Sequence, residues 1–120
     1  MQSRSNSLSR RLLEFAASCI KLTSRLSRTV AGRHVAGQLM RCATSSGANY
    51  QEACGAESRA DFVHKLQVVL KELRETDYWL RLVEASGLLP ATELSPLLKE
   101  LDELTRIMVK SVLTAKSRST

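Results

Sequence analysis

Apolar side chains recur along this chain at alternating intervals of four and three residues, in four separate stretches. Such spacing keeps them on one side of an α-helix, because 3.6 residues complete each turn. The pattern predicts helices over about residues 8–28, 33–54, 59–86 and 92–115. Short connections between long helices favour antiparallel neighbours. The sequence therefore predicts an all-α protein, an antiparallel up-down-up-down four-helix bundle.

Residues with capping chemistry stand near the predicted helix ends. The candidates are Ser7 for the first helix, Gly55 in a left-handed conformation after the second, Ser58 with Asp61 for the third, and Ser95 with Pro96 for the fourth. Hydroxyl side chains accept hydrogen bonds from free amides of a first turn, and proline is tolerated there. An earlier start of the fourth helix, near Thr92, is the alternative, and it leaves Pro96 inside the first turns.

The second predicted helix has an unusually thin apolar face. Its repeat consists of Ala36, Met40, Ala43, Gly47, Tyr50 and Cys54. Small side chains let a neighbouring helix approach closely. In an antiparallel bundle Gly47 lies level with Phe15 and Leu66, so we expect these two side chains to fill the space beside it.

Composition fits a single domain over residues 1–120, with polar, flexible tails at 1–6 and 116–120. The chain has 120 residues, of which 43% are hydrophobic and 25% charged. No apolar run approaches the roughly 20 residues that cross a bilayer. Three cysteines, without CxxC spacing or a secretory signal, predict a reducing cytoplasmic setting and buried thiols. Cys19 and Cys42 lie at a similar height if their helices are antiparallel.

Positive charge is concentrated in the first half of the chain. Residues 1–50 hold eight Arg or Lys against one acid, whereas residues 51–120 hold ten against eleven. At 100° per residue, four cations share the side of the first helix opposite its apolar repeat. With Arg33 they form a candidate surface for RNA or DNA phosphates, bound without sequence preference. The cations of that helix are Arg10, Lys21, Arg25 and Arg28. A solvated basic face without a ligand is the alternative.

The sequence lacks the motifs of common catalytic and cofactor sites. His34 and His64 are isolated from the cysteines, so we expect neither a metal nor another cofactor. Ser45, Ser46 and His64 could form a nucleophile and base, but small polar residues on an inner helix side usually bond to the backbone. We predict that the protein is not an enzyme. The alternative is a small ligand-binding or catalytic bundle with a polar site between helices.

Several polar residues stand among the apolar positions of the second and third helices. They are Gln38, Arg41, Asn49, Glu52, Glu72 and Glu75. Buried hydrogen-bonded pairs among them could set the register between helices or subunits, whereas an exposed, solvated helix face is the other interpretation. Arg41 with a carboxylate of the third helix is the first pair to examine.

Two stretches, QLMRCATSSGANYQEA and DFVHKLQVVLKELRETDYWLRLV, resemble the signature helices of the bacterial four helix bundle protein family. The matching positions are Gln38, Arg41, Ser45, Gly47, Asn49, Glu52, Asp61, Phe62, Lys65, Leu66, Lys71, Glu72, Glu75, Thr76, Tyr78, Trp79 and Leu80. That family includes proteins encoded in intervening sequences of 23S ribosomal RNA genes, formerly labelled ribosomal proteins.

The resemblance implies an antiparallel bundle that assembles into ring-shaped homopentamers. A similar fold serves as the accessory protein of diversity-generating retroelements, a pentamer that binds reverse transcriptase and nucleic acid through a basic surface. The leading hypothesis is therefore a non-enzymatic oligomeric scaffold that contacts RNA or DNA. A regulatory role toward a protein encoded nearby is a third hypothesis. No membrane partner is expected.

Overall fold

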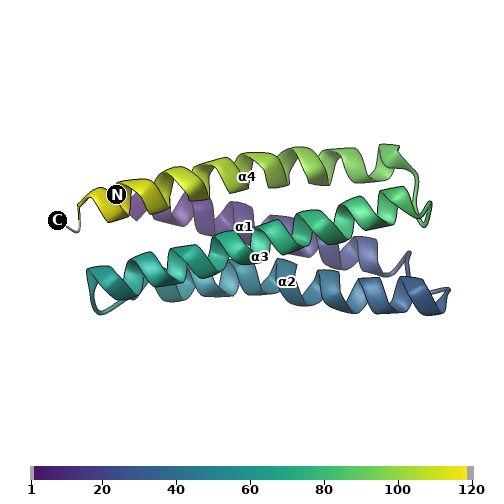
Figure 1. Ribbon diagram of the computed structural model, residues 1–120, viewed down its shortest axis with the longest axis horizontal. Coiled ribbons are helices and arrows are strands. Elements are labelled where there is room, and N and C mark those ends of the chain that lie inside the picture. The colour runs from purple at the N-terminus through teal and green to yellow at the C-terminus, as the bar shows by residue number, and fades with distance from the viewer. Residues whose placement is uncertain (1, 119–120) are drawn as a thin grey trace.

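The computed structural model describes residues 2–118 as four long antiparallel helices (Figure 1). They are α1 (Gln2–Thr23), α2 (Val30–Cys54), α3 (Arg59–Ala85) and α4 (Ala91–Ser117). The rod they form measures 49 × 22 × 21 Å. The all-α class and the four-helix bundle are therefore confirmed.

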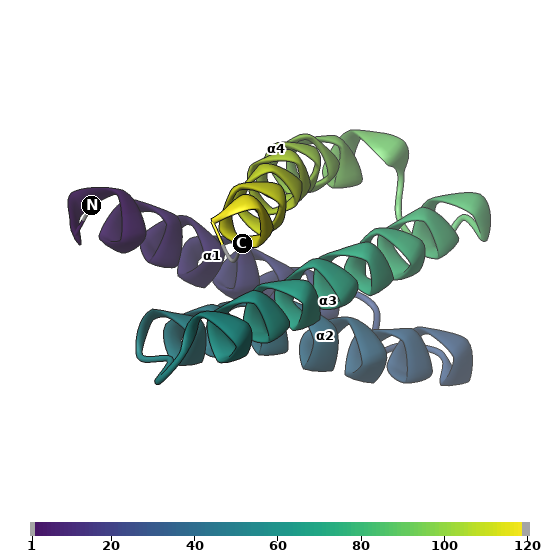
Figure 2. The ribbon, with the colours of Figure 1, turned by 60° about the vertical axis from the view of Figure 1, so that its left-hand side comes forward.

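Helices that follow one another in the chain pack side by side, and α4 returns to α1 to close the bundle. This is the up-down-up-down arrangement. The α1–α4 pair is the loosest of the four. Figure 2 shows that these two helices cross, so they approach each other closely over only part of their length.

The core is built mainly from leucines that the four-three repeat turns inward. Each helix contributes a fully buried leucine: Leu12, Leu39, Leu73 and Leu104. Met108 of α4 is fully buried as well. Burying one such side chain stabilises the fold by about 1.5–3 kcal/mol before entropy is counted. Over the residues described, none of the helices has the length and hydropathy of a membrane span.

The first helix begins and ends earlier than its apolar repeat predicts. It starts at Gln2, so Ser7 lies inside the helix and is not its cap. It ends at Thr23, where the side-chain hydroxyl donates to the carbonyl of Ile20 at 2.6 Å. The Ser24 hydroxyl donates to Lys21 in the same way, at 2.8 Å. Such bonds compete with the helical ladder, and residues 24–28 continue as tighter turns.

The second helix begins at Val30, three residues before the predicted start. Its cap is Thr29, whose hydroxyl oxygen accepts from the amide of Gly32 at 2.9 Å. Gly32 is thus in the first turn and not in a loop. A side chain there would collide with the backbone, because an ideal Cβ would lie 1.8 Å from the carbonyl oxygen of Leu26.

The predicted ends of the last two helices are mostly confirmed. Ser58 Oγ accepts from the amide of Asp61 at 3.1 Å, as its spacing predicts. The fourth helix follows the earlier of its two predicted starts, so Pro96 lies inside it. Gly55 is not left-handed, since its φ is −103°, whereas Gly87 is, with a φ of 73°.

The predicted tails at 1–6 and 116–120 overlap the two terminal helices. Residues 2–6 belong to α1, and residues 116–117 belong to α4. Residues 1, 119 and 120 lie outside the described part of the chain.

Candidate functional site

The predicted cationic face divides into paired and unpaired residues. Arg10 lies 3.5 Å from Glu14 on the same helix. Arg25 forms an ion pair with Glu93 of α4. It also lies beyond the end of α1, as does Arg28, so the four predicted residues do not share one helical face. The early end of the helix is the reason.

Of the five predicted cations, three are exposed and form no ion pair with a carboxylate of the described residues: Lys21, Arg28 and Arg33. They lie in the last turn of α1, in the α1–α2 connection and in the first turn of α2. The only side-chain bond found for them joins Arg33 to the carbonyl of Ser27, at 3.3 Å. A hollow of about 420 Å³ beside this connection is lined in part by Arg25 and Arg28. We call Lys21, Arg28 and Arg33 the basic end.

Arg11 is a cation that sequence reasoning did not single out. Its guanidinium donates to both carboxylate oxygens of Glu100 on α4, at 3.0 and 2.6 Å. Glu103 also lies within 3.4 Å. The hydrogen bond that Arg11 donates to Glu100 raises the pKa of Arg11. This pair ties α1 to α4 and is structural. Its only signal in the sequence is that position 11 borders the apolar repeat.

Arg41, the first residue to examine for a pair with the third helix, does contact carboxylates of α3. Its guanidinium lies 3.4 Å from Glu72 and also contacts Glu75, while Gln38 accepts from it at 3.3 and 3.4 Å. The side chain of Glu72 is only 10% exposed. Trp79 Nε1 donates to Glu75 Oε2 at 3.0 Å. We call these five residues the Arg41 cluster. Each has a partner within the chain.

Aromatic rings border the Arg41 cluster. The rings of His34 and Trp79 meet edge to face, with centroids 5.9 Å apart, and Tyr78 meets Trp79 similarly at 5.2 Å. Tyr78 is largely exposed.

The remaining polar residues of the predicted set behave differently from one another. Asn49 donates to the Ser45 hydroxyl and carbonyl, both at 2.9 Å, so it bonds within α2 and does not bridge helices. Glu52 does bridge, because Lys65 of α3 lies 2.6 Å from it. The hydrogen bond that Lys65 donates to Glu52 raises the pKa of Lys65.

The geometry does not support a nucleophile and base formed by Ser45 or Ser46 and His64. Ser46 is buried and donates to the carbonyl of Ala43 at 2.7 Å. His64 is exposed on α3. Over the described residues, no group of three or more His, Cys, Asp or Glu side chains is placed to hold a metal ion.

Two cysteines are buried and one is exposed. Burial, together with the smaller effect of the neighbouring Cys42, raises the pKa of Cys19 to about 12. Burial also raises the pKa of Cys42, whose sulfur lies 3.1 Å from the Thr76 hydroxyl. Because the thiolate is the reactive form, these two thiols are poor nucleophiles. Cys54 is exposed.

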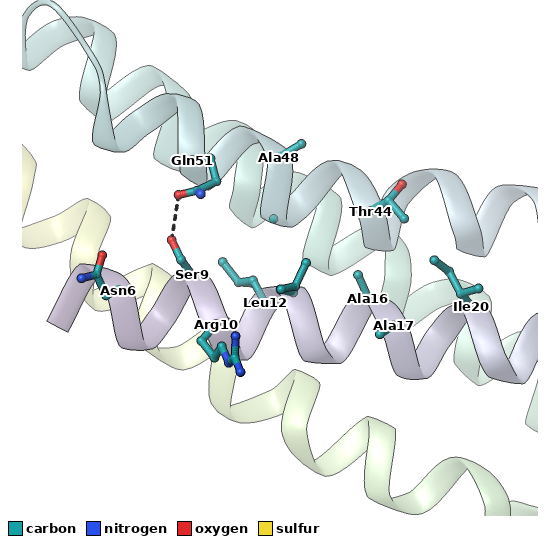
Figure 3. A pocket seen from close by; sticks show the side chains of 12 residues that line it. Asn6, Ser9, Arg10, Leu12, Ala16, Ala17, Ile20, Thr44, Ala48 and Gln51 are labelled. Carbon is teal, nitrogen blue, oxygen red and sulfur yellow. Dashed lines mark hydrogen bonds between the residues drawn. The ribbon is translucent and has the colours of Figure 1, made fainter. Parts of the chain in front are cut away.

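A groove of about 530 Å³ lies between α1 and α2 (Figure 3). Its lining is mainly apolar and consists of Asn6, Ser9, Arg10, Leu12, Leu13, Ala16, Ala17, Ile20, Thr44, Gly47, Ala48 and Gln51. Ser9 donates to Gln51 across it at 3.0 Å. Leu13 and Ile20 are exposed. We call this the α1–α2 groove.

Gly47 lies in this groove, beside a different neighbour from the two predicted. The three atoms nearest to an added Cβ all belong to Leu12, at 3.6 Å or more. Phe15 and Leu66 are instead buried in the core. The level of α1 against α2 shifts by about one turn because α2 begins at Val30. An alanine fits at position 47 with ordinary contacts.

A second hollow, of about 680 Å³, lies at the end of the bundle that holds the α2–α3 connection. It is more polar than the groove. Its ionisable lining residues are Cys54, Glu57, Arg59 and Arg118. Sequence reasoning missed it because these residues come from separate parts of the chain.

The sequence and the fold are both similar to those of one protein family. Residues 5–110 match the family described as 23S rRNA-intervening sequence protein. A solved structure from Bacteroides thetaiotaomicron, a protein of unknown function from the S23 ribosomal protein family, is 31% identical. The match covers 90% of this chain and 96% of that one, with a TM-score of 0.82. No curated protein matches the chain significantly. The ring of five copies stays a prediction. This chain belongs to the 23S rRNA-intervening sequence protein family.

Proposed function

We propose that this protein is a non-enzymatic, homo-oligomeric helical scaffold whose basic end binds RNA or DNA phosphates without sequence preference. The observation that carries the nucleic-acid part is the set of unpaired cations Lys21, Arg28 and Arg33. The first fifty residues supply all of the excess positive charge. Since the family description refers to 23S rRNA, structured ribosomal RNA is the natural first ligand.

Binding of this kind depends on salt, because each phosphate contact releases condensed counterions. We expect the affinity for a fluorescent rRNA hairpin to fall steeply between about 50 and 200 mM KCl. The variant K21A/R28A/R33A should bind at least about tenfold more weakly and show a shallower salt slope. Anisotropy titrations measure both quantities.

The matched control is R10A/R25A, which removes two arginines whose charges are already opposed by Glu14 and Glu93. It should change RNA affinity less than the basic-end variant does. Equal losses would assign the effect to net charge alone. No binding at about 50 mM KCl, where phosphate contacts are strongest, would end the nucleic-acid part of the proposal.

The oligomeric part rests on exposed apolar surface. Leu13, Ile20 and Met40 are at least 40% exposed and lie on α1 and α2. Contiguous exposed apolar surface marks interaction sites in soluble proteins. Light scattering at micromolar concentration should give a mass well above that of the 13.3 kDa chain. A monomer at all concentrations would overturn the scaffold.

The hollow at the α2–α3 end favours a second candidate function, the binding of a small anion. Arg59 and Arg118 both line it, with Glu57 as the opposing charge. A panel of small carboxylates and phosphates, tested by thermal shift against the wild type and R59A/R118A, examines this candidate. A shift that the double variant lacks would support it.

A further inference from the structure

The outer face of α3 carries a row of exposed polar, basic and aromatic side chains that includes no acid. At intervals of three and four residues it holds His64, Gln67, Lys71, Arg74, Tyr78 and Arg81, all exposed. This spacing places them on one side of the helix. The last member, Arg81, is opposed by Asp77 at 3.4 Å. We call Lys71, Arg74 and Tyr78 the α3 stripe.

The two cations of the α3 stripe form no ion pair with a carboxylate of the described residues. Asp77 and Asp102 line the same hollow of about 260 Å³ as Arg74. Each of these acids pairs instead with an arginine one turn away on its own helix, Arg81 or Arg106. The positive charge of the α3 stripe is therefore open to an anion from outside the chain.

The ring of Tyr78 is both exposed and supported. The residue is 59% exposed, and its ring meets that of Trp79 edge to face at 5.2 Å. Trp79 is held in turn, because it donates to Glu75 at 3.0 Å and its ring meets that of His34 at 5.9 Å. A side chain that is already ordered loses little freedom when a flat ligand stacks on it. Tyr78 is therefore a ready stacking platform.

The α3 stripe leads toward the basic end. His34, whose ring reaches Trp79, directly follows Arg33 of the basic end. Figure 1 shows the last turns of α3 and the α1–α2 connection at the same end of the rod. A nucleic-acid strand with phosphates on the basic end therefore has Tyr78 within its reach.

An exposed aromatic ring next to cations fits an unpaired base. Bases in a single strand can leave their neighbours and stack on such a ring, whereas the bases of a duplex are stacked on one another. The basic end has no aromatic member, so it contacts the phosphates of either form. An acidic peptide would meet the same cations, but the flat ring and the nearby basic end favour nucleic acid.

We propose that the α3 stripe binds unpaired nucleotides of a single-stranded nucleic acid, with a base stacked on Tyr78 and neighbouring phosphates held by Lys71 and Arg74. The inference rests on the proposed nucleic-acid binding and names its ligand class. The basic end binds paired and unpaired segments alike, and the α3 stripe adds the preference for unpaired bases. No base is preferred, because every base has a flat face.

The first experiment compares two substitutions at Tyr78. Y78F keeps the ring and loses the hydroxyl, whereas Y78L keeps apolar bulk and loses the ring. The probe is a fluorescent RNA of about 12 nucleotides, free or annealed to its complement, at about 50 mM KCl. In anisotropy titrations Y78L should bind the single strand at least about fivefold more weakly and the duplex within about twofold of the wild type. Y78F should bind both forms as the wild type does.

Two further measurements accompany these titrations. Circular dichroism checks that both variants fold, which is expected because Tyr78 is largely exposed. Trp79 is the only tryptophan of the chain, and its ring touches that of Tyr78. Its fluorescence should therefore change when the single strand is added to the wild type. Unchanged emission at saturating RNA would overturn the stacking.

The second experiment tests the cations of the α3 stripe. K71A/R74A should weaken single-strand binding and make its salt slope shallower by up to about 1.4, because each phosphate contact contributes about 0.7. The matched control is K99A/K110A, which removes two exposed lysines of α4 that also form no ion pair within the described chain. It should change both quantities less. Equal changes would assign the effect to net charge and overturn the α3 stripe.

Each unfavourable result has a separate meaning. No binding of either RNA form overturns both the proposed nucleic-acid function and the α3 stripe. Binding that Y78L leaves unchanged overturns the α3 stripe alone, and if Y78L then lowers the mass in light scattering, the stripe is a protein contact. Equal weakening of single strand and duplex by Y78L overturns the stacking, as does a Y78F variant that binds as weakly as Y78L.

Discussion

Gly32 and Gly37 lie five residues apart in α2 and have opposite surroundings. A Cβ at position 32 would lie 1.8 Å from the carbonyl oxygen of Leu26 and 2.9 Å from the Thr29 hydroxyl. A Cβ at position 37 would meet nothing within 4 Å. The first glycine is required by the close approach of the α1–α2 connection, and the second only weakens the helix.

We predict that Gly32→Ala lowers the free energy of unfolding by about 2 kcal/mol or more, because the backbone must shift to relieve the overlap. Gly37→Ala should raise it by up to about 1 kcal/mol, the difference in helix propensity. Urea denaturation at a fixed protein concentration measures both. Similar effects of the two substitutions would contradict the tight turn.

Cys19 shows how burial changes the chemistry of a single side chain. Its pKa is raised to about 12 by burial and by Cys42. We predict that only Cys54 reacts rapidly with a disulfide reagent near pH 8, since it is the exposed thiol. The other two should react after unfolding. Rapid reaction of three thiols in the native protein would contradict the buried placement.

The same shift makes stability depend on pH. The unfolded Cys19 thiol ionises near its ordinary pKa of 9.0, while the folded thiol keeps its proton. The folded state then binds more protons, so stability falls as the pH rises above 9.0. Between about pH 9 and 11 the loss should be about 2 kcal/mol. Chemical denaturation at several pH values should show a flatter profile for Cys19→Ala.

The sequence predicts the four helices well and their ends unevenly. The apolar repeat marks the residues that pack against other helices, and it extends over many positions. It therefore predicts α2 correctly even though the residues around Gly47 have weak helix propensity. Ser58 is found as a cap because its partner, Asp61, is three residues away. Ser7 fails as a cap because α1 continues to Gln2. Local chemistry indicates that a cap can form and does not show where a helix stops.

In the candidate site, too, some contacts can be predicted from the sequence and others depend on where the helices end. The pair between Arg41 and the carboxylates of α3 is predictable, since a cation and acids stand among apolar positions of neighbouring helices. The pairing of Arg25 with Glu93 is not, because it depends on where the chain turns after Thr23. The α1–α2 groove also escapes prediction, since the repeat through Leu13 and Ile20 is hidden beside the stronger core repeat.

The contact between α2 and α3 gives a prediction about the Arg41 cluster. Arg41 is about half exposed, whereas Glu72 is nearly buried. The variant R41M leaves that carboxylate without its cation, and we expect a loss of about 1–2 kcal/mol, between the values for exposed and buried pairs. Adding E72Q should recover part of this loss, because a neutral amide needs no counter-charge. Urea denaturation of the single and double variants measures the coupling.

The matched control is R81M on α3, which breaks an exposed pair with Asp77 one turn away. We expect a change of about 0.5 kcal/mol or less. If R41M behaved like R81M, the cluster would be an ordinary solvated surface and would not set the register of α2 against α3.

Charge is distributed unevenly along the chain but is partly matched across the folded molecule. The basic first half meets acids of the second half through Arg11 with Glu100, Arg25 with Glu93, and Arg41 with Glu72. These pairs join different helices or the connections between them. The excess positive charge that they leave unopposed includes the basic end.

The α1–α4 contact gives the last prediction, since it is the loosest pair in the bundle. Arg11 holds Glu100 through two hydrogen bonds, and about one third of each side chain is exposed. We expect Glu100→Gln to cost about 1 kcal/mol, because charged hydrogen bonds exceed neutral ones and partial exposure weakens them. For a bundle of this size the midpoint of thermal unfolding should fall by about 5 °C.

Asp102→Asn is the control for this prediction, because Asp102 pairs with Arg106 of the same helix, at a largely exposed position. It should leave the midpoint nearly unchanged. Hydrogen exchange adds a local readout: in Glu100→Gln, amides of α1 and α4 should exchange faster while those of α2 and α3 change little. Uniform acceleration in all four helices would instead mean that α1 and α4 do not open separately from the rest of the bundle.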